Sequence, residues 1–420
     1  MLTPAGITYA PLFLNNCINK GENTMQSFTK EVVLAAASGH YNEIACRFLP
    51  MLNLAVSRPG RHVPDPFRAG SKDGFRVFKD FNVKGKMIFN QAFGETNKVM
   101  DVWELMDTLG ISKNFNDALE QVGTFLGCER TGFHIKGTSY QPIDKKRQEE
   151  ALAAAKQAAA KVEAEAKKAE EERYQKGEVA ISKQLEMTIP LSVKDPRCKP
   201  VFDYFENRGL GMLKYAPESL FRDLRYSPRT PYFENGKVTG YYDALVSIVH
   251  ANNKVWTLHR IFLLNGQKAP VSSAKKVMTP KFDGKDTSRF IRLGDVPEHG
   301  IIGIAEGIET ALSCFCGTRL PVWSAISATF LEEFTPPKNV KAVIIFADKD
   351  KSEVGQKSAE ILRKRLLEKG IKAWVCLPKS EIPQDSHGID WNDELKQKGV
   401  FGFPDPIKLF EFITDKLQKK

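Results

Sequence analysis

The stretch IIFADKD, residues 344–350, decides how the C-terminal half of this chain folds. An apolar run gives way to two carboxylates, Asp348 and Asp350, on either side of Lys349. A short, wholly apolar run of this kind is typical of a strand buried on both faces, as in a parallel sheet. Two adjacent carboxylates repel each other and raise each other's pKa unless a cation lies between them. The stretch therefore predicts a buried strand that ends at a site of unusual chemistry.

Similar apolar strands alternate with helical patterns around this stretch. Near-continuous apolar strands between helices indicate an α/β fold, with a mainly parallel sheet covered by helices on both faces. The second expected helix is strongly amphipathic and is ended by Gly370. The expected strands are residues 300–306, 321–327, 341–348 and 372–378, and the expected helices are residues 307–317 and 353–370.

Acidic residues stand at the carboxyl ends of these strands, where ligands bind in open parallel sheets. They are Glu306, the Asp348 and Asp350 pair, and Asp390 with Asp393. Residues two apart in an extended chain point the same way, so the pair is expected to face one spot. Oxygen ligands suit Mg²⁺, which also takes oxygens from a substrate phosphate. A solvated turn explains most isolated D-x-D sequences, but a glutamate and a D-x-D at successive strand ends are more specific.

Composition sets broad limits on the function. The chain has 420 residues, 42% of them hydrophobic, which leaves room for two or three domains. The net charge of +10 favours a polyanionic partner such as nucleic acid. Apolar stretches of about 20 residues are absent, so no membrane span is expected. The seven cysteines form no C-x-x-C pair, which favours a reducing cytoplasm over a disulfide framework.

Changes of pattern suggest the domain boundaries. Residues 144–176 are rich in Ala, Glu and Lys and predict a long, solvated helix, whereas Asn252-Asn253 between two β-rich runs predicts a hairpin. We expect an irregular extension over residues 1–24, a mixed α+β domain over 25–135, a charged helical linker over 140–184, a mixed α+β subdomain over 185–297, the parallel-sheet domain over 298–400 and a C-terminal helix over 401–420.

Several motifs in the C-terminal half resemble one known family. AEGIETALS, residues 305–313, resembles the glutamate motif of Toprim domains, and IFADKD, residues 345–350, resembles their D-x-D motif. Six further segments are similar in order and spacing to Toprim DNA primases of conjugative plasmids, phages and integrative elements. They are NRGL (207–210), TLHRIFL (257–263), SAKKV (273–277), IRLGD (291–295), PVWSAISA (321–328) and IDWND (389–393).

The resemblance implies roles for the acidic residues. Glu306 would be a general acid or base, Asp348 and Asp350 would hold Mg²⁺ or Mn²⁺, and Asp390 would be a further acidic ligand. In bacterial replicative primases another Asp follows the glutamate by four residues, where this chain has Thr310. The acidic cluster is thus thinner here, and the sequence leaves open whether Glu309 compensates.

Basic residues in the resembling segments are expected to bind nucleotide or template phosphates. Each taken alone is more often a solvated surface charge. Arg260 and Arg292 are favoured, because an unpaired charge is costly in an apolar β-rich context. The full set is Arg208, His259, Arg260, Lys275, Lys276 and Arg292.

The expected N-terminal domain resembles the zinc ribbon of these primases without its thiolates. In HVPDPFRAGSKDGF, residues 62–75, Asp65 and Arg68 stand in cysteine positions, as do Asn90 and Phe93 in NQAFG, residues 90–94. No zinc is therefore expected, since a structural site needs four good ligands. We expect apolar packing to hold this degenerate ribbon together, through Phe67, Phe75, Phe78, Phe89 and Phe93.

The resemblance implies a DNA primase that makes short RNA primers on single-stranded DNA from ribonucleoside triphosphates. Such an enzyme acts by metal-assisted nucleotidyl transfer, here in the replication or transfer of a mobile element. Two alternatives stay open: a non-catalytic single-stranded-DNA-binding accessory protein and a Toprim nuclease. The short chain argues against a topoisomerase. G-x-x-x-x-G-K-[ST] is absent, so a helicase would be a separate chain.

Overall fold

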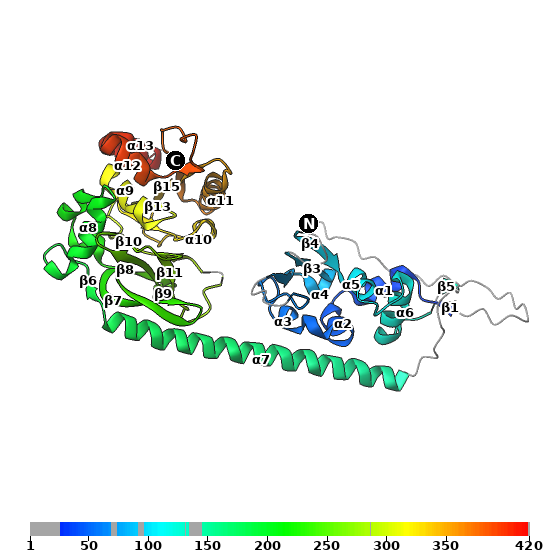
Figure 1. Ribbon diagram of the computed structural model, residues 1–420. Helices are drawn as coiled ribbons and strands as arrows, with labels where there is room; N and C mark the ends of the chain where they lie inside the picture. Colours follow the sequence, from blue (N-terminus) through cyan, green and yellow to red (C-terminus); the bar gives the residue numbers. More distant parts are fainter. Residues whose placement is uncertain are drawn as a thin grey trace, which may run out of the picture. The chain divides into compact units, whose positions relative to one another are not determined.

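The computed structural model describes residues 26–68, 74–90, 96–130, 132–133, 145–285 and 287–418 (Figure 1). The chain divides into two units, Met1–Ala169 and Glu170–Lys420. The expectations for residues 1–24, for linker residues 140–144 and for Phe93 lie outside the described residues. No helix in the described ranges is long and apolar enough to cross a membrane.

The N-terminal unit is a mixed α+β domain, in which helices pack on a three-stranded antiparallel sheet of order β2-β3-β4. Glycines with positive φ end two of its helices: Gly85 (φ 64°) follows α4 and Gly127 (φ 77°) follows α6. Its elements are β1 (Gln26–Ser27), α1 (Lys30–Ala37), α2 (Tyr41–Phe48), a 3-10 turn (Pro50–Leu52), α3 (Asn53–Val56), β2 (Phe75–Val77), α4 (Phe81–Lys84), β3 (Lys86–Phe89), β4 (Lys98–Asp101), α5 (Val102–Thr108), α6 (Phe115–Leu126) and β5 (Gly132–Phe133).

Aromatic packing holds the segment that resembles a ribbon. Phe75 and Phe89 lie opposite each other on β2 and β3, are buried, and stack with ring centroids 4.5 Å apart. The ring centroids of Phe67 and Phe89 are 5.8 Å apart, and the backbone of Val63 forms an isolated β-bridge with Phe75. Part of the aromatic packing expected from the sequence is therefore present in the described residues.

Helix α7 (Lys145–Glu186) forms where the Ala-, Glu- and Lys-rich segment predicted a helix. Its last turns pack on the C-terminal unit: Ile181 is fully buried, and Leu185 lies in the same apolar cluster. Gly177 permits this approach, because a Cβ there would lie 2.4 Å from the carbonyl oxygen of Pro280. The helix is therefore anchored at its C-terminal end.

The first part of the C-terminal unit is an antiparallel sheet of order β10-β9-β8-β7-β6, on which β11 pairs with β9 and β12 with β8. The predicted hairpin is confirmed: Asn252 (φ 50°) and Asn253 (φ 59°) join β8 to β9. The elements are β6 (Ile189–Pro190), α8 (Lys199–Asn207), β7 (Leu224–Glu234), β8 (Lys237–Ala251), β9 (Lys254–Leu264), β10 (Gln267–Lys268), β11 (Lys275–Val277) and β12 (Arg289–Phe290), with 3-10 turns at Pro196–Cys198, Gly211–Tyr215 and Glu218–Phe221.

The two faces of this antiparallel sheet pack against different neighbours. Leu245, Ile261 and Leu263 belong to the large core that also contains residues of α8 and of the parallel sheet. We call this side the inner face. Val246 and Phe262, at alternate positions on the same strands, pack with Ile181 of α7 instead. We call this side the outer face.

Neighbouring lysines on β11 lie on opposite faces of the sheet. Lys275 pairs with Ile261 of β9, and Lys276 pairs with Arg260. Residues directly opposite each other in an antiparallel pair project on the same side. Lys275 is therefore on the inner face, whereas Lys276 and Arg260 are on the outer face.

A parallel sheet of order β14-β13-β15-β17 forms the second part of the C-terminal unit, above the antiparallel sheet in Figure 1. A two-stranded ribbon of β16 and β18 follows its carboxyl edge. The elements are β13 (Ile301–Ala305), α9 (Ile308–Thr318), β14 (Val322–Ser324), α10 (Ala328–Glu333), β15 (Ala342–Phe346), β16 (Lys349–Asp350), α11 (Val354–Glu368), β17 (Lys372–Cys376), β18 (Gly388–Ile389), α12 (Trp391–Lys398), a 3-10 turn (Gly399–Gly402) and α13 (Pro406–Gln418).

Helices cover both faces of the parallel sheet, which confirms the predicted α/β fold. Ile344 and Phe346 of β15 pack in the core that contains α9, whereas Val343 and Ile345 pack in the cluster that contains α10 and α11. All five residues of β13 and of β15 are buried. The apolar strand pattern thus reflects burial on both sides.

We expect Ile181→Ala to destabilise the C-terminal unit by about 2–5 kcal/mol, because it removes a fully buried side chain from the anchor of α7. Val179 on the same helix is 69% exposed, so Val179→Ala should change the free energy of unfolding by no more than about 0.5 kcal/mol. Urea unfolding of both variants measures the difference. Equal, small effects would show that α7 is not anchored there.

Candidate active site at the strand ends

Glu306 directly follows β13 at the carboxyl edge of the parallel sheet. Burial raises the pKa of its carboxyl group, Lys275 opposes this, and Asp350 reinforces it. The Glu306 carboxylate also accepts a hydrogen bond from the backbone N–H of Ala328, the first residue of α10. The net result is a raised pKa, which makes the Glu306 carboxylate a stronger proton acceptor than an ordinary one.

Strained backbone lies next to Glu306. The Glu306 carbonyl oxygen accepts from the Ile326 backbone N–H at 2.7 Å and from Ser324 Oγ at 2.9 Å. Ile326 has φ 71°, in the left-handed region that β-branched residues rarely occupy. Strain of this kind persists where the surrounding structure imposes it, often at functional sites. Nothing in the sequence indicated it.

Asp348 follows β15, the strand next to β13, and is the most perturbed acid at this edge. Its Oδ1 is buried without a hydrogen-bond partner among the described residues. Burial raises the pKa of Asp348 to about 8, with the negative charges of Asp390, Glu306 and Asp350 adding to the effect. A buried carboxyl group among other carboxylates is a costly arrangement that a cation would relieve.

Asp350 is perturbed in the opposite direction. It belongs to β16, a separate short strand beyond the end of β15, whereas Asp348 lies between the two strands. Its carboxylate accepts hydrogen bonds from the backbone N–H groups of Gly355 (3.0 Å) and Val354 (3.2 Å) and from Ser352 Oγ (2.5 Å). Although burial opposes them, these bonds lower the pKa of Asp350 and stabilise its charged form.

Asp390 serves as the N-cap of α12. Its side chain accepts from the backbone N–H of Asp393 at 2.8 Å, and the Asp393 side chain accepts in return from Asp390, which completes a capping box. Burial raises the pKa of Asp390, whereas the nearby Arg208 lowers it. Asp390 therefore has a structural task in addition to its negative charge near Asp348.

The expected basic residues do not form one group. Lys275 on the inner face influences Glu306 electrostatically, and Arg208 influences Asp390. The buried His259 pairs with Val277 of β11 and also lies on the inner face, where burial and then Lys275 lower its pKa to about 4. Lys275 and Arg208 therefore lie near the acidic strand ends, and His259 lies near Lys275 and Glu309.

Arg260 and Lys276 lie on the outer face, away from this group. Arg260 is 5.2 Å from the ring centroid of Phe262, and burial lowers the pKa of its guanidinium to about 10. Lys276 Nζ is 3.8 Å from the ring centroid of Tyr232 and donates to the Phe233 carbonyl oxygen at 2.5 Å. Aromatic rings and a carbonyl, rather than the acidic residues, lie against these charges, and the buried Nε of Arg260 has no hydrogen-bond partner among the described residues.

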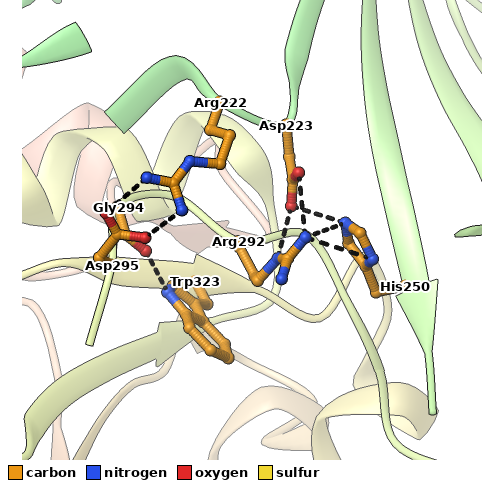
Figure 2. Close-up of polar contacts among 7 residues, drawn as sticks. All are labelled: Arg222, Asp223, His250, Arg292, Gly294, Asp295 and Trp323. Atoms are coloured by element: carbon orange, nitrogen blue, oxygen red, sulfur yellow. Dashed lines mark hydrogen bonds and ion pairs between the residues drawn. The ribbon is translucent and has the colours of Figure 1, made fainter. Parts of the chain in front are cut away.

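Arg292 is paired inside the protein (Figure 2). Its Nε lies 2.9 Å from Asp223 Oδ2, and its terminal nitrogen lies 2.9 Å from His250 Nε2, which is itself 2.8 Å from the same Asp223 oxygen. Burial would raise the pKa of Asp223, but His250 and Arg292 outweigh it and lower the pKa. The sequence favoured Arg292 as a ligand-binding residue because its context is apolar. In the structure, Arg292 has internal partners instead, Asp223 and His250.

The sequence left the role of Glu309 open and did not single out Lys268. Glu309 and Lys268 form an ion pair of 2.6 Å, and Glu309 forms a second one of 2.6 Å with Lys275. Glu309 lies in the first turn of α9, three residues after Glu306, and that spacing was a usable signal. Lys268 is an isolated lysine after a turn, so no pattern distinguished it from a surface charge.

Within the described residues, no group of three or more His, Cys, Asp or Glu side chains is placed to hold a metal ion. The carboxylates at the strand ends interact electrostatically without forming a complete protein cage. A cation bound here would need oxygens from a second source, such as a substrate phosphate or water.

Comparison with known families agrees with this geometry. Residues 301–400 match the Toprim domain, and residues 189–287 match a domain of unknown function, DUF7146. The parallel-sheet part of this chain is therefore a Toprim domain. Along the chain, the DUF7146 match precedes the Toprim match and the acidic strand ends. No curated protein matches the chain.

Several solved structures are weakly similar to this chain. The zinc-binding and RNA polymerase domains of the Aquifex aeolicus primase have 13% identity, coverage of 89% of this chain and 85% of that chain, and a TM-score of 0.34. A DnaG primase catalytic domain bound to single-stranded DNA has 12% identity, coverage of 58% and 78%, and a TM-score of 0.35. The RNA polymerase domain of the Mycobacterium tuberculosis primase DnaG has 11% identity, coverage of 55% and 80%, and a TM-score of 0.28. Similarities this low leave the activity to be argued from the site.

We expect Asp348→Asn to raise the melting temperature at pH 8 and to change it little at pH 4, both without divalent metal. The pKa of Asp348 is about 8 in the folded chain against an ordinary value of 3.8, so the folded state binds this proton more tightly. Stability that is present below pH 4 is therefore lost as the pH rises to 8. Asn cannot ionise and avoids this loss.

Thermal unfolding at the two pH values measures this effect. Each kcal/mol that Asp348→Asn adds to the free energy of unfolding should raise the melting temperature by about 2–4 °C. Asp295→Asn is the control, because that carboxylate is 57% exposed and pairs with Arg222. A lower melting temperature for Asp348→Asn at pH 8 would show that the ionised carboxylate stabilises the fold.

Proposed function

We propose that this protein is a DNA primase that makes short RNA primers on single-stranded DNA by divalent-metal-dependent nucleotidyl transfer. The observation that carries the proposal is the group of carboxylates at the ends of β13 and β15, with Asp348 buried and unpaired among the described residues. In a Toprim domain, such a group is suited to chemistry on phosphates. The motif order of the chain favours the replication or transfer of a plasmid, phage or integrative element.

A divalent cation fits the residues at this edge. The unpartnered Oδ1 of Asp348 is a free oxygen ligand, and the ionised form of Asp350 is already stabilised by hydrogen bonds. We propose these two as the metal ligands, with Asp390 adding negative charge. When bound, Mg²⁺ or Mn²⁺ would neutralise charge on the transferring phosphoryl group. The neighbouring carboxylates raise the proton affinity of Asp348, so metal binding here should strengthen as the pH rises.

The remaining roles belong to groups of this chain. We propose that Glu306 accepts the proton of the attacking 3′-hydroxyl, since it lies at the strand ends and its pKa is raised, mainly by burial, which makes it a stronger base than an ordinary carboxylate. Lys275 and His259 on the inner face, together with Arg208 at the end of α8, supply donors for the nucleotide or template. The protein must also orient the two substrates, because holding them in reacting geometry supplies much of the rate acceleration. Single-stranded DNA, ribonucleoside triphosphates and a separate helicase are the proposed partners.

The primase proposal is tested by incorporation of labelled ribonucleotides on single-stranded DNA. Glu306→Gln keeps the size of the side chain but cannot take the proton, so synthesis should fall by roughly 10²- to 10⁴-fold. Binding of single-stranded DNA should stay near the wild-type level, because it depends on basic groups. Asp348→Asn should also lose synthesis, and raised Mg²⁺ should recover part of it.

Asp295→Asn is again the matched control and should make primers at the wild-type rate. Cleavage of the template without any primer would favour a Toprim nuclease, which could use the same carboxylates. DNA binding with neither reaction would favour an accessory protein. Wild-type synthesis by Glu306→Gln would remove Glu306 from the proposed chemistry.

A further inference from the structure

A buried carboxylate beside the proposed active site holds two lysines. Glu309 of α9 has a side chain that is only 5% exposed, and its two oxygens each lie 2.6 Å from an ammonium group: Oε1 from Lys268 Nζ and Oε2 from Lys275 Nζ. Tyr204 of α8 donates its hydroxyl to Oε1 at 2.7 Å. Side chains from α8, β10 and β11 of the antiparallel part therefore contact the single side chain of Glu309 in the Toprim domain.

Charge balance shows that Glu309 is the anchor of this group. Burial alone would raise its pKa, but Lys275 and Lys268 outweigh burial and hold the pKa of Glu309 well below its usual range. One carboxylate faces two ammonium groups, so the cluster has a net positive charge. The side chain of Lys268 is 35% exposed and that of Lys275 is 44% exposed, so both can also contact a ligand that comes from solvent. An ammonium has three donors, and Glu309 occupies one on each lysine.

The lysine pair stands next to the proposed chemistry and next to unsatisfied polar groups. Lys275 is the strongest favourable charge acting on Glu306. His259 on the same face is 6% exposed, and its Nδ1 has no hydrogen-bond partner among the described residues. Ser247 pairs with His259 across β8 and β9, and its buried Oγ also lacks a partner there. Buried polar atoms are normally hydrogen-bonded, so these two atoms are ones that a water or a ligand could satisfy.

We propose that Glu309 is a positioning residue that holds Lys268 and Lys275 as a pair, and that this pair binds the polyphosphate of the incoming nucleotide beside Glu306. The inference rests on the proposed primase function and names a site for its substrate. Two ammonium groups fixed by the two oxygens of one carboxylate match a ligand with several neighbouring anionic oxygens. Their charges provide the affinity, and Glu309 provides the placement that the reaction needs.

The first test measures the binding of inorganic triphosphate by calorimetry, without DNA or metal. Lys268→Met and Lys275→Met should each weaken binding by about 10-fold, as expected for loss of one charge-assisted contact. Lys276→Met is the matched control: it removes the same charge from the adjacent residue on the outer face, and binding should stay within about two-fold. Equal weakening by Lys275→Met and Lys276→Met, or no weakening by Lys268→Met, overturns the proposal.

The second test separates positioning from charge. Glu309→Gln can still accept from Tyr204, but it no longer holds the ammonium groups. Triphosphate should bind at least as tightly as to the wild type, because a negative charge is lost, while kcat for primer synthesis should fall by about 10-fold or more. Glu309→Asp, which keeps the charge on a shorter side chain, should recover part of kcat. Weaker triphosphate binding together with unchanged kcat would overturn the role of Glu309.

The triphosphate titration keeps this inference separate from the primase proposal. If the wild type makes no primer but binds triphosphate through Lys268 and Lys275, the primase proposal fails and the polyphosphate site stands. If primers are made and Lys268→Met binds triphosphate normally, the polyphosphate site fails alone.

Discussion

Parallel pairing of β13 with β15 is the constraint on which the C-terminal unit depends. Parallel strands bring their carboxyl ends to one edge, so Glu306 and Asp348 are forced into the same neighbourhood. Burial and then the repulsion from neighbouring carboxylates raise the pKa of Asp348 to about 8, so an ionised Asp348 opposes folding. A sheet buried on both faces has enough apolar packing to tolerate this cost. The site is therefore a region that the fold supports at some expense of stability.

The antiparallel sheet supplies the opposite charges. Its inner face carries Lys275 toward Glu306, while Lys268 and Lys275 share the buried Glu309. Arg292, Asp223 and His250 form a separate polar cluster close to the bridge between Ile291 and Ser324, which joins the two sheets. Ion pairs thus form both near the strand ends and where the sheets meet. The two parts of the C-terminal unit depend on each other electrostatically as well as through their common apolar core.

The strands and helices of the Toprim domain could be predicted because burial on both faces leaves a simple apolar pattern. The gathering of its acidic residues at one edge could also be predicted, because parallel strands all have their carboxyl ends at the same edge of the sheet. The side-chain partners could not be predicted in the same way. Arg260 and Lys275 are close in the β9–β11 pairing, yet the face each occupies depends on strand register, which a single sequence does not specify. Likewise, the ion pair between Glu309 and Lys268 depends on how α9 packs on the antiparallel sheet, which a single sequence does not specify.

The adjacent lysines of β11 have a consequence for how this site tolerates change. Shifting a strand by one residue moves every side chain to the other face of its sheet. In β11 such a shift would exchange Lys275 and Lys276, so an ammonium group would still project inward. The doublet makes this position robust to a one-residue deletion in the loop before β11, whereas a one-residue insertion would place Ala274 opposite Ile261. Lys268 on β10 has no such neighbour, since Gln267 precedes it and Ala269 follows. A one-residue deletion before each strand would therefore remove the ammonium group at the position of Lys268 and keep one at the position of Lys275.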